Sequence, residues 1–186
     1  MIFDPYRLIC LFPIVFILHD FEELILFEPW LKKNASVIID RIENKVPAFL
    51  EGQLKTVLKK STTQFALPIS LIFILTCISS LLAAEYGRYS FFLLAGSLFF
   101  LHGFMHIGQA IFLRRYIPAV ITSVLIIIPY GVALFWGLVV SGIIGIPSLL
   151  IIFLIAAVIA IPFILLMHIV GEYLYKRAIN LLVGQE

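Results

Sequence analysis

The stretch that decides the fold is IPSLLIIFLIAAVIAIPFILLMHIV, residues 146–170, which contains no Asp, Glu, Lys or Arg. A helix of about 20 apolar residues is long enough to cross the roughly 30 Å hydrocarbon core of a bilayer. Residues 66–84 form a second uncharged stretch. In the whole chain of 186 residues, 62% are apolar and 13% are charged, whereas soluble domains average roughly 25% charged residues. We therefore expect an integral membrane protein, and the composition excludes an ordinary soluble globule.

Apolar segments separated by charges and turn residues predict an all-α, polytopic membrane protein. The connections at 85–88 and 141–145 are short, so the helices that they join should be antiparallel neighbours. The whole chain, 1–186, is predicted to form a single transmembrane domain embedded in the lipid bilayer. Its five predicted spans cover about 7–28, 65–84, 90–112, 118–140 and 147–172.

Positive charges predict the orientation of these spans, because Lys and Arg next to membrane helices are retained in the cytoplasm. Eleven of the 13 Lys and Arg residues lie in the 30–63 connection, at 114–115 and at 176–177. The other two, Arg7 and Arg88, lie on the opposite side. We therefore expect the N-terminus outside the cell and the C-terminus in the cytoplasm.

The long connection 30–63 has a pattern of its own. Apolar residues recur there at three- and four-residue steps from Ile38 to Leu58, with lysines and acids between them. This pattern predicts an amphipathic helix on the cytoplasmic membrane surface, interrupted near Pro47. A membrane anchor, a docking face for a partner and a lid over a site are all compatible with it.

Titratable residues inside the predicted spans form the candidate functional site. Placing such a group in the hydrocarbon of a bilayer costs several kcal/mol of free energy. A titratable residue inside a span is therefore expected to have a function. Residues three and four positions apart share one face of a helix. Three spans carry such faces: His19, Glu22 and Glu23 on the first, His102 and His106 on the third, and His168 and Glu172 on the fifth.

These side chains are predicted to lie at one depth. They stand four to thirteen residues before the basic residues that end their helices, and the four histidines are roughly 12–20 Å from the cytoplasmic boundary. Helix backbone groups are already bonded to one another, so the side chains must satisfy each other, water or a metal. We therefore expect one site, located toward the cytoplasmic leaflet.

The residue types favour a divalent metal as the cofactor. Nitrogen and oxygen ligands without cysteine suit iron or zinc, and two histidines one helical turn apart can chelate an ion. Seven candidate ligands allow one or two ions, with Glu22 or Glu23 as a bridge between two. Residues placed to support the ligands are Asp20, Gln109, Tyr130 and Tyr175.

The stretch His19-Asp20-Phe21-Glu22-Glu23 resembles the motif of the HXXEE family of bacterial and archaeal integral membrane proteins. The chain length, the position of the motif in the first span and the later intramembrane histidines are similar to that family. The resemblance implies a polytopic protein of a prokaryotic plasma membrane and groups the histidine with the two glutamates. The function of the family is unknown, so the resemblance names no substrate.

Three functions are open at this point. The first is a membrane metalloenzyme in which histidines hold the metal and Glu22 or Glu23 acts as a base, activating water or oxygen against an apolar, lipid- or isoprenoid-like substrate. The second is a metal-independent hydrolase. Its glutamate pair resembles that of the glutamate-type membrane proteases related to CAAX-processing enzymes, although Phe27 stands where those have arginine.

The third function is a transporter or sensor for metal ions or protons. Transport normally needs polar groups at several depths, whereas the external halves of the first, third and fifth spans are almost wholly apolar. A nucleic-acid partner is excluded, because the net charge is only +2 and no basic tract is interleaved with aromatic residues. The pattern leaves the oligomeric state open.

Overall fold

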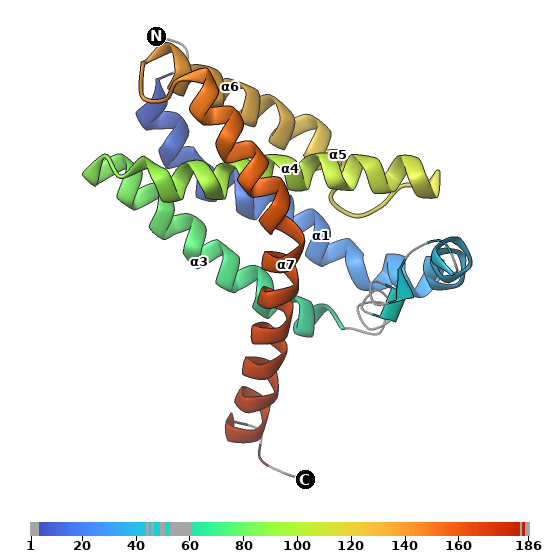
Figure 1. Cartoon of the computed structure of the whole chain (residues 1–186). Coiled ribbons are helices and arrows are strands. Elements are labelled where there is room, and N and C mark those ends of the chain that lie inside the picture. The colour runs from blue at the N-terminus through green and yellow to red at the C-terminus, as the bar shows by residue number, and fades with distance from the viewer. Residues whose placement is uncertain are drawn as a thin grey trace.

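The computed structural model describes residues 4–43, 45, 47–48, 51–52, 61–182 and 184, and these residues contain helices and no strand. The all-α prediction is therefore confirmed for this part of the chain. The helices shown in Figure 1 are α1 (Pro5–Ile42), α3 (Thr62–Tyr86), α4 (Tyr89–Leu113), α5 (Val120–Thr122), the π-helical turn η1 (Ser123–Ile127), α6 (Ile128–Val140) and α7 (Ile146–Leu182).

In the part of the chain that the structure describes, four helical segments are long and apolar enough to cross a membrane, which confirms a polytopic membrane protein. They are α3, α4, α7 and the continuous helix Val120–Val140 that α5, η1 and α6 form together. The α1 helix also covers a predicted span, but Asp20, Glu22 and Glu23 interrupt its apolar surface. The α7 helix has 37 residues, and Figure 1 shows its C-terminal half extending beyond the other helices.

The α1 helix is longer than the sequence indicates. The first span is predicted to end at about residue 28, yet the same helix continues to Ile42. Tertiary contacts explain the difference, because Leu31 and Ile38 are buried and the Trp30 indole donates a 2.7 Å hydrogen bond to the Tyr116 carbonyl. Most of 44–60, the rest of the predicted amphipathic segment, lies outside the described residues.

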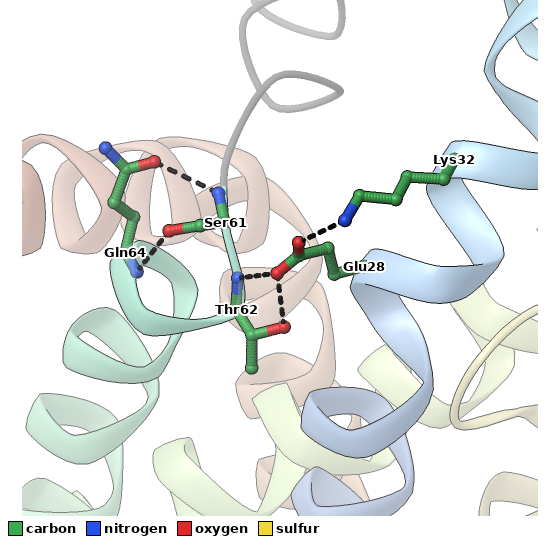
Figure 2. A network of polar contacts seen from close by, with 5 residues as sticks. All are labelled: Glu28, Lys32, Ser61, Thr62 and Gln64. Carbon is green, nitrogen blue, oxygen red and sulfur yellow. Dashed lines mark hydrogen bonds and ion pairs between the residues drawn. The ribbon is translucent and has the colours of Figure 1, made fainter.

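Polar contacts fix the start of α3 against the middle of α1 (Figure 2). Ser61 and Gln64 form a capping box, in which the serine hydroxyl accepts from the Gln64 N–H and the glutamine oxygen accepts from the Ser61 N–H. The Glu28 carboxylate accepts from both the N–H and the hydroxyl of Thr62, at 3.0 and 3.1 Å. Lys32 forms an ion pair with Glu28 at 2.7 Å. The two Glu28–Thr62 bonds join the helices, although the chain between them is long.

Glycines let other helices approach closely. A Cβ at Gly171 would lie 2.6 Å from the Pro68 ring, so α7 packs directly on α3 at this point. A Cβ at Gly103 would lie 2.8 Å from Ile127 Cγ2, so α4 packs directly on η1. Small residues have this role in many membrane bundles. The second contact is next to His102, and it sets how near α4 comes to the helix that begins at Val120.

Candidate metal centre

Two helices bring four titratable side chains together. His19 and Glu23 lie one turn apart on α1, and His102 and His106 lie one turn apart on α4. Each side chain offers one ligand atom, and the four atoms all lie within 4.8 Å of one another. His19 and His106 are buried, whereas Glu23 and His102 are partly exposed. We call these four residues the His/Glu cluster.

The cluster has the dimensions of a metal site. Tetrahedral zinc holds nitrogen and oxygen ligands at about 2.0–2.2 Å, which sets the ligand atoms about 3.3 Å apart. The Nε2 atoms of His102 and His106 are 2.8 Å apart, and the centroid of the His19 ring is 5.5 and 5.2 Å from the centroids of those two rings. Small side-chain movements would therefore complete a coordination shell.

Two buried ring nitrogens support this interpretation. Nε2 of His19 and Nδ1 of His106 have no hydrogen-bond partner among the described residues. Buried polar atoms in proteins are nearly always bonded to a protein group, water or an ion. The unpaired Nε2 of His19 belongs to a ring that lies edge-on to both histidines of α4. This nitrogen is therefore suited to binding a metal ion.

Glu22 lies outside the cluster, because its side chain is directed to the helix that begins at Val120. Its carboxylate accepts from the Thr122 N–H at 2.8 Å and from the Thr122 hydroxyl at 2.6 Å. The Tyr116 hydroxyl donates to it at 2.7 Å, and the Ile121 N–H donates at 3.4 Å. Burial and the neighbouring carboxylate raise the pKa of Tyr116, so its hydroxyl remains a donor. The adjacent glutamates of the motif therefore have different surroundings.

The same threonine connects Glu22 to the cluster. Thr122 Oγ1 lies 2.9 Å from Nδ1 of His19.

Pro129 explains the irregular helical turn that follows Thr122. Proline lacks an N–H, and its ring would clash with a carbonyl four residues earlier in a regular helix. The helix widens before Pro129 into η1, where the Ile128 N–H donates to the Ser123 carbonyl, five residues back. Such π-helical turns are frequent at functional sites.

The loop between α4 and α5 is held against α1 beside the site. The Arg115 guanidinium donates a hydrogen bond to the Asn34 side chain at 3.1 Å, and the Trp30 indole donates one to the carbonyl of Tyr116. Ala119 is fully buried and has a φ of 71°, a left-handed conformation that alanine rarely adopts. These contacts fix the loop that carries the Tyr116 hydroxyl to Glu22.

The two candidate ligands of α7 lie elsewhere in the structure. The His168 ring is 5.3 Å from that of Phe65 on α3, and Phe65 stacks on Phe27 at 4.1 Å. Glu172 forms an ion pair with Lys176 at 2.9 Å. Neither belongs to the four-residue cluster. Counting residues to a helix end gives depth but not lateral position, so it could not separate α7 from the other two helices.

The four predicted supporting residues also lie in different surroundings. Asp20 is buried, and one of its oxygens has no partner among the described residues. Gln109 is exposed and Tyr175 is partly buried. Tyr130 donates its hydroxyl to the Leu8 carbonyl at 2.8 Å, so this bond is made to α1 backbone rather than to the cluster.

Sequence reasoning missed Thr122 and Tyr116. A single hydroxyl in an apolar helix or a short loop has no distinctive spacing. The available signal was Thr122 and Ser123 at the start of an otherwise apolar span that contains Pro129.

One comparison with known proteins identifies a family. A family model described as a protein of unknown function with HXXEE motif matches residues 10–134, which is most of the chain. The chain belongs to the HXXEE family. The HXXEE match covers all four residues of the cluster and ends before α7 begins. No curated protein and no solved structure matched this HXXEE protein.

Proposed function

We propose that this HXXEE protein binds one divalent metal ion through the His/Glu cluster and uses it as a membrane metalloenzyme. The observation that carries the proposal is the convergence of three imidazoles and one carboxylate, with ligand atoms within 4.8 Å, between α1 and α4. Four donors are a complete set for one ion, so the proposal specifies one ion rather than two. Nitrogen and oxygen donors without cysteine favour zinc or iron.

The exposure of the cluster suggests where chemistry would occur. Glu23 and His102 are partly exposed, whereas the other two ligands are buried, so an exchangeable ligand would approach from the first pair. A metal held there would supply Lewis-acid chemistry, which polarises water, or dioxygen in the case of iron. One oxygen of Glu23 would complete the shell, and its other oxygen would accept a proton from the attacking group.

The surroundings favour an apolar substrate. Phe21 on α1 is 50% exposed and Phe104 on α4 is 48% exposed, so the helices that carry the ligands present aromatic side chains at their surfaces. A lipid- or isoprenoid-like molecule could therefore reach the site through the membrane. The proposal includes a location in a prokaryotic plasma membrane with the site toward the cytoplasmic leaflet, because Arg114 and Arg115 lie at the near end of α4.

Two other functions have less support. A hydrolase that uses the adjacent glutamates as its acid and base needs both to reach substrate, yet Glu22 accepts four hydrogen bonds from Tyr116, Ile121 and Thr122. A conduit for ions needs polar groups on both sides of the cluster. On the side where α1 begins, Phe99 lies edge-on to His19 at 5.6 Å and packs against Phe12 and Phe16.

Elemental analysis of the detergent-purified protein tests the metal site. We expect about one equivalent of zinc or iron in the wild type and its loss when His102 and His106 are both changed to Ala. His168→Ala is the matched control, since it removes a membrane histidine that lies outside the cluster, and it should retain the metal. Full retention by the double variant would refute the proposed site, and loss in the control would show that α7 contributes a ligand.

A further inference from the structure

The HXXEE motif contains two adjacent glutamates whose surroundings differ. We propose that Glu22 is a positioning residue that acts through the Thr122 hydroxyl to hold His19 in the tautomer that binds the metal, whereas Glu23 supplies the oxygen ligand. This inference rests on the proposed metal site and assigns the roles of residues around it.

The hydroxyl of Thr122 fixes the direction of the hydrogen bonds. Its oxygen lies 2.6 Å from Glu22 Oε2, 2.9 Å from His19 Nδ1 and 3.2 Å from the Ala119 carbonyl. A hydroxyl has one proton to donate and two lone pairs that accept. The carboxylate can only accept and is the nearest of the three, so it receives the proton. The hydroxyl oxygen must then accept from the Nδ1–H of His19.

This direction determines which nitrogen of His19 can bind a metal. A neutral imidazole protonated at Nδ1 has its lone pair on Nε2. That atom is buried and has no hydrogen-bond partner among the described residues. It is part of the ring that contacts the rings of His102 and His106. Carboxylates and hydroxyls that orient a ligating histidine in this way typically change metal affinity by about 10- to 100-fold.

Glu22 is held firmly enough to set this orientation. One of its oxygens accepts both the backbone N–H and the hydroxyl of Thr122, so that residue is fixed at two points. The other oxygen is held by the Tyr116 hydroxyl. Its charge also suits the site, because a divalent ion bound to Glu23 leaves one excess positive charge. The Glu22 carboxylate balances that charge without binding the ion.

The first arm of the test measures metal affinity. Thr122→Val removes the hydroxyl at nearly constant volume, and Thr122→Ser retains it. We expect zinc affinity in detergent to fall about 10- to 100-fold in the valine variant and to recover to within a few-fold of wild type in the serine variant. Thr76→Val, at a buried threonine of α3, controls for the loss of a hydroxyl elsewhere. Wild-type affinity in Thr122→Val would overturn the inference.

The second arm separates positioning from ligation. At saturating cobalt(II), Glu22→Ala should give the wild-type visible spectrum because no ligand is lost, whereas Glu23→Ala should change it. A changed spectrum in Glu22→Ala would mean that Glu22 binds the ion and would overturn the inference.

The third arm uses the metal-free protein. The ¹⁵N NMR signals of His19 should show the Nδ1–H tautomer in the wild type and in Thr122→Ser, but not in Thr122→Val. The opposite tautomer in the wild type would overturn the inference even if the metal binds. A wild-type protein that binds neither zinc, iron nor cobalt would instead refute the metal site itself, so the two failures are distinguishable.

Discussion

Replacing Gly103 by alanine tests how closely α4 must approach η1 for the metal centre to form. The added Cβ would lie 2.8 Å from Ile127 Cγ2 and 3.3 Å from Ile127 Cβ, whereas carbon atoms in good contact are about 3.5–4.0 Å apart. One of the two helices must therefore move by about 0.7 Å or more. Ile127 is fully buried, so its side chain has little room to retreat.

Overpacking of this kind typically destabilises a protein by about 1–3 kcal/mol. For a chain of this size, each kcal/mol of destabilisation lowers the midpoint of thermal unfolding by about 2–4 °C. In detergent, Gly103→Ala should therefore unfold with a midpoint roughly 2–12 °C below that of the wild type. Zinc affinity should fall as well, because the shift separates His102 and His106 from His19. Isothermal titration of zinc into the same preparations measures that second effect.

Gly108→Ala is the matched control on the same helix. A Cβ at Gly108 would meet nothing within 4 Å, and alanine is the better helix former by up to about 1 kcal/mol. We therefore expect this variant to be as stable as wild type or slightly more stable, with unchanged zinc affinity. Equal midpoints and equal affinities for the two variants would refute the claim that close packing of α4 on η1 builds the site.

Three further predictions concern the metal, the helix start and a residue outside the cluster. Zinc at about 100 times its dissociation constant should stabilise the wild type by about 2.7 kcal/mol in thermal unfolding, and this gain should vanish when His102 and His106 are both changed to Ala. Glu28→Ala removes both bonds to Thr62, so amide hydrogen exchange there should accelerate while zinc affinity stays constant. Tyr130→Phe should lower the free energy of unfolding by about 1 kcal/mol, the value of one hydrogen bond, and should leave zinc affinity unchanged. A large loss of zinc affinity would show that Tyr130 contributes to the metal site.

Much of the fold could be predicted because uncharged apolar runs in a membrane have few alternatives to helices. The α1 helix shows where that argument stops. Charges after residue 28 indicated a separate surface helix, but Trp30 and Leu31 pack against the rest of the protein and the helix continues to Ile42. Hydropathy reports the preference for lipid or water, and it does not report contacts between elements far apart in the sequence.

The candidate site was predictable to a similar degree. Helical spacing placed His19 with Glu23, and His102 with His106, each pair on one face. Glu22 appeared equivalent to its neighbour because the two are adjacent in the motif. Successive helix positions differ by about 100° in direction, so only the packing of the helix Val120–Val140 against α1 could show that Glu22 faces Thr122 instead of the cluster.

The sequence by itself determined that this protein is helical, that it is built for a membrane, and that three helices carry possible metal ligands at helical spacing. These properties follow from hydropathy and helical periodicity, which are local. The tertiary structure decided which faces meet, because Gly103 brings α4 onto η1 while His168 packs against Phe65 on α3. Such contacts depend on side-chain shape across different helices, and no spacing within one helix encodes them.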